Sequence, residues 1–495
     1  MIVPFQGFLG QQNKTSNLGG DPRYFEILDN CNVTYRTGEI TKDVGYAQFG
    51  NSVIETNMSP TGFFDFHQSP TMQRALVTIN NAAGTNLQLL YHDSPYATAG
   101  AWTAISIGTT WNAFEDSAVE MESFLGYCFF VGYDSTDDAF LPVATLTGTT
   151  FSTTDGTTDM PQGKFIKRYR DRIYLLNTRT GGTNYPYRVY FTNAGVRTWD
   201  LTNNFVDFDY GSEITGGGVV GDLLLAFTPY QCWFYNQVQR KVLFNQGCVA
   251  HRTIKNYAQA LFFANTEGVW ITKGGEPTLI SQDVRNFIKA STNPAGWFAE
   301  INQDEYWLYI GSTVTVRTDG ESFSYSNCVL IYNINENTWR VRELGHIPTI
   351  FMGSYNRTTG IQSMHIGATN GYAYTVSLPD ASSPTYSYAG SDISALFRTR
   401  PLDLGDQVNE KIVEKIYGYA GRAQGLKLKG RWIAKNRKSR WFDIGEMNNQ
   451  FEEFNLPPDD KSGLFLQIEG LERSQRTSFS FKGFNIRTNL ETNKV

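Results

Sequence analysis

The stretch that decides the fold is RDRIYLLNTRTGGTNYPYRVYFTNAGVRTWD, residues 170 to 200. Two runs that mix aromatic, aliphatic and polar residues flank the Gly181–Gly182 turn, and Trp199 follows the second run. Aromatic and β-branched residues favour strands, and paired glycines favour the tight turn that joins two strands. The stretch therefore predicts a β-hairpin with a tryptophan behind it.

Similar units recur along most of the chain. Apolar runs of four to eight residues, broken by Gly, Asn, Asp, Ser and Thr, extend from about residue 21 to 390. Hairpin-like pairs return in LFFANTEGVWITKGGEP (261–277) and MHIGATNGYAYTV (364–376), and YNINENTW (332–339) resembles the Tyr-to-Trp step of a kelch blade. Strands at this spacing predict an all-β protein. One segment, SQDVRNFIKAS (281–291), instead predicts a short helix with Ser281 as its N-cap.

Degenerate repeats of this kind favour a β-propeller. Each blade of a propeller is a four-stranded meander, and large side chains fill the gaps between neighbouring blades. We expect five to seven blades, with six as the first choice. Three tryptophans are expected to be wedges between blades: Trp199 and Trp339, which lie at hairpin ends, and Trp270.

The character of the chain changes near residue 391. Alternation of apolar and polar residues continues in LKLKGRWIA (426–434) and SFSFKGFNIR (478–487), which favours strands. We therefore predict an N-terminal arm over 1–20, a propeller over 21–390 and a β-sandwich-like module over 391–495.

This C-terminal part also carries a strongly basic hairpin. Seven cations lie within fourteen residues, namely Lys427, Lys429, Arg431, Lys435, Arg437, Lys438 and Arg440. They are the candidate contact to a partner protein or to nucleic-acid phosphates. The alternative is a solvated hairpin, or a rim that meets an acidic partner.

Composition limits the classes of function. The 495 residues carry a net charge of −6, which argues against a protein that grips nucleic acid over its whole surface. The five cysteines are widely spaced and contain no C-x-x-C pair, which predicts buried thiols made in a reducing cytoplasm. The first twenty residues do not resemble a signal peptide, and no run is long and apolar enough to predict a membrane span.

Catalytic and cofactor motifs are not found. None of the five histidines falls at a metal-ligand spacing, and GGGVVGD (216–222) precedes a strand-like LLLAF rather than the helix of a phosphate-binding loop. Adjacent acids such as Asp304 and Glu305 point to opposite faces of a strand, so they do not form a carboxylate pair. We therefore expect no enzymatic activity, no metal and no cofactor.

Four segments together resemble one protein family. NCNVTYRTGEITKDVGYAQFG (30–50), the hairpin region near 168–199, GCVAHRTIKNYAQALFFANTEGVWITKGGEPTLIS (247–281) and RTRPLDLGDQVNEKIVEKIYGYAG (398–421) are similar to segments of the tail hub, nozzle or DNA-stabilisation proteins of short-tailed bacteriophages. The resemblance covers about residues 25 to 490. It rests on pattern and carries no binding or catalytic residue across.

The resemblance implies a structural component of a virion tail, synthesised in the host cytoplasm. Such proteins form a ring, usually of six copies, below the portal and its adaptor, and contact the tail fibres or spikes. The ring extends the channel through which genomic DNA passes without sequence-specific binding, and helps to retain the packaged genome.

Two other functions remain open from the sequence. One is a glycan-active or glycan-binding propeller of the depolymerase or sialidase kind, which would need convergent carboxylates at one propeller end. The other is a monomeric, kelch-like propeller that binds proteins.

Overall fold

The computed structural model describes most of the chain. The described residues are 1–12, 21, 23–34, 38–50, 52–94, 100–112, 118–134, 137–153, 160–318, 320–357, 359–378, 384–422, 425–434, 437–474 and 478–490. Nearly all regular structure in them is β-strand, as the composition predicts. None of the helices in this part of the chain has the length and apolar character that a membrane crossing requires.

In the described residues the propeller contains seven blades, each built on four antiparallel strands. The first blade contains β6 (Pro60–Ser69), β7 (Met72–Asn80), β8 (Leu87–Asp93) and β9 (Thr103–Ile105), and the second contains β10 (Ala118–Phe124), β11 (Tyr127–Asp134), β13 (Ala144–Thr147) and β14 (Thr150–Ser152), with β12 (Ala139–Phe140) beside β11. The third blade contains β15 (Gln162–Tyr169), β16 (Arg172–Thr180), β17 (Thr183–Phe191) and β18 (Phe205–Asp207). The fourth contains β19 (Gly216–Val220), β20 (Leu223–Phe227), β21 (Cys232–Tyr235) and β22 (Arg240–Phe244). The fifth blade contains β23 (Lys255–Tyr257), β24 (Ala260–Asn265), β25 (Gly268–Thr272) and β26 (Thr278–Leu279). The sixth contains β27 (Phe298–Asn302), β28 (Glu305–Thr318), β29 (Glu321–Asn333) and β30 (Thr338–Glu343). The seventh contains β31 (Pro348–Tyr355), β32 (Gln362–Ala368), β33 (Ala373–Val376) and β5 (Tyr46–Gln48).

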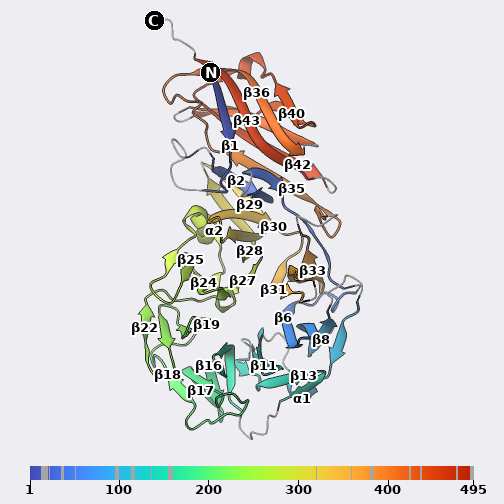
Figure 1. Cartoon of the computed structure of the whole chain (residues 1–495), viewed down its shortest axis with the longest axis vertical. Helices are drawn as coiled ribbons and strands as arrows, with labels where there is room; N and C mark the ends of the chain where they lie inside the picture. Colours follow the sequence, from blue (N-terminus) through green and yellow to red (C-terminus); the bar gives the residue numbers. More distant parts are fainter. Residues whose placement is uncertain are drawn as a thin grey trace.

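The ring closes through a strand from the start of the chain. β5 precedes the first blade in sequence but pairs with β33 as the outer strand of the seventh blade. The innermost strands β31 and β6 then lie in contact, and the blades follow one another around a ring (Figure 1). Seven blades lie at the upper end of the predicted range and are one more than the six that we expected first. The extra blade combines strands from distant parts of the sequence, so no contiguous repeat reveals it.

Large apolar side chains fill the gaps between neighbouring blades. Seven buried clusters each combine residues from two adjacent blades, and an eighth forms the core of the C-terminal module. Trp199 lies in the cluster of the second and third blades, Trp270 packs against that of the fourth and fifth, and Trp339 lies in that of the fifth and sixth. The Trp339 ring lies 5.0 Å from that of Tyr332, its cross-strand neighbour.

The glycine run 216–218 also belongs to blade packing. These residues begin β19, the innermost strand of the fourth blade. A Cβ at Gly217 would lie 2.6 Å from Leu176 of the third blade, and one at Gly218 would lie 2.7 Å from Leu261 of the fifth. The glycines therefore let the inner strand approach both neighbouring blades closely.

The C-terminal module is a sandwich of two sheets. One contains β3 (Cys31–Thr34), β4 (Glu39–Lys42), β43 (Ser480–Leu490), β36 (Lys411–Arg422) and β40 (Phe451–Phe454), with β1 (Ile2–Gln6) and β41 (Ser462–Gly463) at its edges. The other contains β2 (Phe25–Asp29), β35 (Ser391–Thr399), β42 (Phe465–Ser474), β37 (Leu426–Ala434), β38 (Arg437–Lys438) and β39 (Phe442–Met447). Both sheets bury the cluster that contains Phe25, Phe397 and Phe481.

The first 42 residues contribute strands to this module. β1 pairs with β43, β4 pairs with β43, and β2 lies between β30 of the sixth blade and β35. Through β34 (Ser387–Tyr388) and β5 the same sheet also reaches the seventh blade. The module therefore joins the ring at its sixth and seventh blades, and the N-terminus lies on the module (Figure 1). The strands before β5 thus belong with the module, whereas the sequence suggested an arm and the start of the propeller.

Short helices occupy the connections: α1 (Gly108–Asn112), α2 (Arg285–Ala290) and the 3-10 turns η1 (His251–Thr253), η2 (Gln282–Val284), η3 (Pro294–Gly296) and η4 (Pro458–Asp460). The helix expected over 281–291 forms as η2 followed by α2. Ser281 makes no side-chain cap there, because its hydroxyl accepts a hydrogen bond from the Val269 backbone instead. Ser281 thus stands at the N-cap position as expected, but without the side-chain capping bond.

Candidate site in the central cavity

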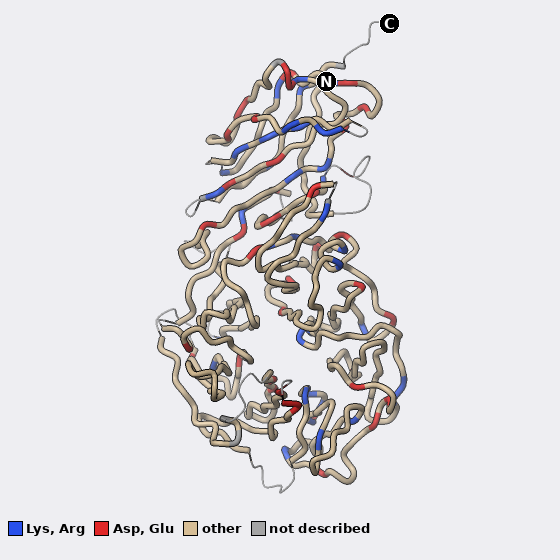
Figure 2. The backbone as a smooth tube through the Cα atoms, turned by 180° about the vertical axis from the view of Figure 1, so that it is seen from behind, with Lys and Arg blue, Asp and Glu red and all other residues tan. Residues whose placement is uncertain are grey.

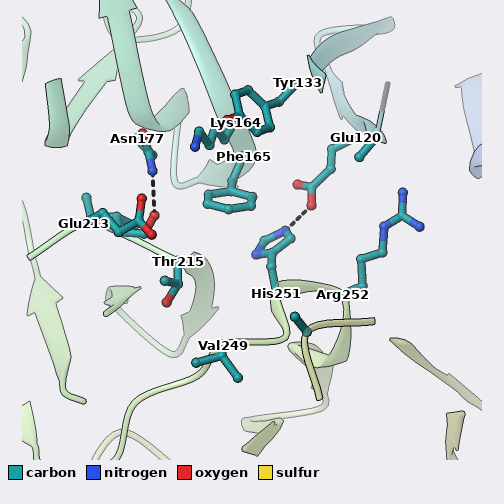
Figure 3. Close-up of a pocket in the computed structure, with 13 residues that line it drawn as sticks. Glu120, Tyr133, Lys164, Phe165, Asn177, Glu213, Thr215, Val249, His251 and Arg252 are labelled. Carbon is teal, nitrogen blue, oxygen red and sulfur yellow. Dashed lines mark hydrogen bonds and ion pairs between the residues drawn. The ribbon is translucent and has the colours of Figure 1, made fainter. Parts of the chain in front are cut away.

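The innermost strands of the blades surround two adjoining cavities near the ring centre. The larger has a volume of about 450 Å³ and is lined from β6, β10, β15, β23, β27 and β31. The smaller has a volume of about 280 Å³ and lies toward the connections 213–215 and 249–252 (Figure 3). Both are lined by Glu120, His251 and Arg252. The larger volume lies within the range typical of sites for small molecules.

The connection between the fourth and fifth blades reaches across the ring. It carries η1, from which His251 pairs with the Glu120 carboxylate on β10 of the second blade (Figure 3). The next residue, Arg252, donates a hydrogen bond to the Thr61 carbonyl of the first blade at 2.7 Å. η1 therefore ties blades together that are not neighbours in the ring.

Packing fixes the position of the His251 ring. Its centroid lies 4.1 Å from that of Phe165 on β15. On another side Gly216 leaves room for it, since a Cβ at that position would lie 2.6 Å from His251 Nδ1. A ring held by an aromatic neighbour, a carboxylate and a backbone has little freedom to turn.

Two glutamates of β10 line the larger cavity, and their pKa values are shifted in opposite directions. Glu120 and Glu122 are two positions apart, so their side chains leave the strand on one face. Burial would raise the pKa of Glu120, but His251 and Lys167 outweigh it and lower the pKa to about 2. Burial raises the pKa of Glu122, and Lys167 and the backbone N–H groups of Arg168 and Ser123 only partly oppose it. The first carboxylate is thus held ionised, while the second retains its proton more readily.

One ring nitrogen of His251 lacks a hydrogen-bond partner among the described residues. The side chain is 9% exposed, and burial lowers its pKa, so the neutral ring donates Nε2–H to Glu120. Nδ1 has no hydrogen-bond partner within the described part of the chain, but it is buried against Gly216 and is not accessible to a ligand. The ring therefore serves to position the Glu120 carboxylate.

The remaining walls combine charge with aromatic rings. Lys255 pairs with Glu300 at 2.9 Å, and the larger cavity is also lined by phenylalanines from three blades. In the smaller cavity the Lys164 ammonium lies 3.8 Å from the centre of the Tyr133 ring (Figure 3). Among the described residues, no group of three or more His, Cys, Asp or Glu side chains is placed to hold a metal ion.

The basic hairpin lies far from this cavity, in the module. Arg431 is 3% exposed and, with Lys438, pairs with Glu321 at the start of β29. Figure 2 shows basic and acidic residues interleaved on the strands of the module. Arg431 is thus buried and Lys438 is half-buried, and both are paired with Glu321, contrary to the free basic tip that we expected. Lys427, Lys429, Arg437 and Arg440 keep the predicted partner contact as a prediction, and Lys435 lies outside the described residues.

The glutamate pair has a signal in the sequence that we missed. AVEMESF (118–124) places acids at alternate positions of a strand, which directs both to one side. We considered only adjacent acids, whose side chains point apart. The role of His251 had no such signal, because its partner lies 131 positions earlier and only closure of the ring brings the two together.

Comparison with known proteins adds distant structural similarities. No protein-family model and no curated protein sequence matches the chain. A solved structure described as a glycoside hydrolase is similar over 89% of this chain and 99% of its own, at 10% identity and a TM-score of 0.26. The exo-β-1,3-galactanase of Phanerochaete chrysosporium is similar over 90% and 100%, at 10% identity and 0.27. The acylaminoacyl peptidase of Pyrococcus horikoshii is similar over 76% and 58%, at 8% identity and 0.34.

These similarities are too distant to transfer an activity, but they correct one expectation. We predicted that the chain is not an enzyme. The structures that it resembles include glycoside hydrolases, so that exclusion was wrong and we do not keep it. What the fold and the site define together is a seven-bladed β-propeller with a charged central cavity.

Proposed function

We propose that the protein binds a glycan in its central cavity and cleaves a glycosidic bond there. The observation that carries the proposal is the pair Glu120 and Glu122, which line one cavity with pKa values shifted in opposite directions. Glycoside hydrolysis commonly uses two carboxyl groups, one protonated and one ionised. Glu122 is the candidate acid that protonates the leaving oxygen, and Glu120 is the candidate ionised carboxylate.

The walls suit a sugar as well. Rings such as Phe63 and Phe351 offer apolar surface for the C–H faces of a sugar, and Lys255, Glu300 and Arg252 offer partners for its hydroxyl groups. A neutral, polyhydroxylated ligand fits a wall on which cations and carboxylates alternate.

The test uses the purified full chain with a panel of soluble polysaccharides, and measures the release of reducing ends. Because general acid catalysis contributes about 10²–10⁴-fold, we expect E122Q to lower the rate by that factor. E120Q should also inactivate, whereas E453Q, on β40 of the module, should not. Equal activity of E122Q and the parent protein, or release from no polysaccharide, would contradict the proposal.

A second candidate, a ring-forming component of a phage tail, rests on the four segments that resemble that family. It predicts assembly of several copies around an axis and contact with a portal adaptor. Electron microscopy of the chain mixed with a portal–adaptor complex tests it. Rings with added density on the adaptor support this candidate, whereas single particles in that mixture count against it.

A further inference from the structure

A separate enclosed cavity lies where the sixth and seventh blades meet the segment between β4 and β5. Its volume is about 210 Å³. Polar side chains of Asn32, Asn302, Gln303 and Ser377 line part of it, and Trp307 and Met364 contribute apolar surface. Gln303 is exposed in the turn between β27 and β28, so the cavity borders the protein surface there.

Two arginines of β30 also line this cavity, and one of them is fully paired. Arg340 donates to both carboxylate oxygens of Glu305, at 2.5 and 3.0 Å, and lies 3.5 Å from Asp43. It therefore uses the two carboxylates that border the cavity. A bidentate arrangement of this kind is the strongest that an arginine forms with a carboxylate.

The other arginine, Arg342, is left without a carboxylate. Its side chain is 1% exposed, and one Nη2–H donates to the Val44 carbonyl at 2.5 Å. Nε has no hydrogen-bond partner, and within the described residues no carboxylate lies within ion-pair distance of the guanidinium. Its nearest ring neighbour is Trp307, whose centre lies 4.8 Å away.

Burying a cation without an anionic partner is energetically unfavourable. Burial of a charge is tolerated when the charge is paired and hydrogen-bonded, and the Val44 carbonyl, the Tyr388 hydroxyl and the Trp307 ring satisfy the guanidinium only in part. A carboxylate matches the planar fork of an arginine with two parallel hydrogen bonds. Within the described residues Arg342 has no carboxylate of its own, because Arg340 engages both Asp43 and Glu305, and those two carboxylates disfavour a dianion such as phosphate.

We propose that this cavity binds a small organic carboxylate, with its charged group on Arg342. The Trp307 ring and Met364 would contact the apolar part of the molecule, and the amides of Asn302 and Gln303 would bind its hydroxyl groups. The site is separate from the central cavity and does not depend on the proposed glycan cleavage.

The test is titration calorimetry on the full chain with acetate, hydroxyacetate and benzoate. Acetamide, the uncharged counterpart of acetate, and inorganic phosphate are the comparison probes. We expect saturable binding of at least one carboxylate with one site per chain, and weaker binding of acetamide. R342K keeps the charge but loses the planar fork, and should weaken binding of the carboxylate by about tenfold or more, because it loses a charge-assisted hydrogen bond.

A second variant serves if Arg342 proves necessary for folding. N302D is nearly isosteric and adds a negative charge to the cavity wall, so it should weaken carboxylate binding by a similar factor. N184D, which changes an exposed residue of the third blade, is the matched control and should bind as the parent protein does.

Three results would overturn the proposal. The first is the absence of saturable binding with every carboxylate. The second is binding that neither R342K nor N302D changes, which would indicate that the carboxylate binds adventitiously, outside this cavity. The third concerns Asp380, which follows Leu378 by two positions in the sequence. Binding that appears only in D380N would assign Arg342 to a carboxylate of the chain itself.

Discussion

The central cavity and the interior of the C-terminal module both hold buried charges, but the two regions treat them differently. In the module, Lys42 of β4 and Glu472 of β42 pair across the two sheets at 2.5 Å, with side chains 0% and 2% exposed. Arg398 likewise divides its guanidinium between Glu321 and Glu469. In the central cavity, Lys167 and two backbone N–H groups only partly oppose the effect of burial on the pKa of Glu122. Closed pairs of charges hold strands together, whereas a carboxyl group that lines a cavity, as Glu122 does, is available to a ligand.

The largest effect should follow from opening a closed pair. K42M leaves Glu472 as a buried carboxylate without its ammonium partner, and the loss of one partner of a buried pair typically costs about 3–5 kcal/mol. We expect the free energy of unfolding to fall by that amount, measured by urea denaturation at pH 7.

The double variant K42M/E472L supplies the control. When both charges are replaced by apolar groups of similar volume, most of the lost stability should return. A single variant as stable as the parent protein would show that the pair contributes nothing and would remove the contrast with the cavity.

A pH titration should reveal another closed group, His365 of the seventh blade. Its ring nitrogens lie 2.8 Å from Ser354 Oγ and 2.9 Å from Thr375 Oγ1, and burial lowers its pKa from 6.5 to about 4. The unfolded chain binds the proton more readily between these values, so stability is lost as the pH falls from 6.5 to 4. At about 1.4 kcal/mol per pH unit, the loss is about 3 kcal/mol.

Denaturation curves collected between pH 7 and pH 4 measure this loss. In H365Q the component that belongs to His365 should disappear, while the acid sensitivity of other groups remains. An identical pH dependence in the variant and the parent protein would contradict the assignment.

The same contrast explains which features the sequence could predict. The strands, the propeller and the sandwich follow from local alternation and from hairpins such as 172–191, because these depend on neighbouring residues. Trp199 and Trp339 could be singled out since they end hairpins. The seventh blade could not, because β5 and β33 are distant in sequence and pair only once the ring has closed.

The candidate site likewise contains residues that a local pattern could predict and residues that it could not. Glu120 and Glu122 lie on one short strand, so their shared face can be read from the alternation of AVEMESF. His251 and Arg252 act through blades that lie across the ring, and no local pattern contains that information. The prediction of buried thiols is confirmed, since all five cysteines are buried and free of disulfides.

A smaller effect, with the opposite sign, is expected from an open group. Burial raises the pKa of Glu122, so the folded protein binds this proton more tightly than the unfolded chain does. Its contribution to stability is present at low pH and is lost as the pH rises through the folded pKa. E122Q keeps the shape of the protonated acid and should therefore be as stable as the parent protein at pH 4, below the usual glutamate pKa of 4.5, and slightly more stable at pH 8. Urea denaturation at both pH values checks this, and a clear loss of stability at pH 8 would place Glu122 among the closed, structural charges.

The smallest effect should come from a pair on the outer face of the module. Lys415 of β36 pairs with Glu453 of β40, but the two side chains are 37% and 39% exposed. Water screens such a pair and solvates each partner when the other is removed, so exposed pairs contribute little to folding. K415Q should therefore leave the urea midpoint within the error of the measurement, both at low salt and in 0.5 M salt, where screening is stronger. A fall comparable to that of K42M would show that burial does not separate the two kinds of charge pair. The contrast between the module interior and the central cavity would then rest on pairing alone.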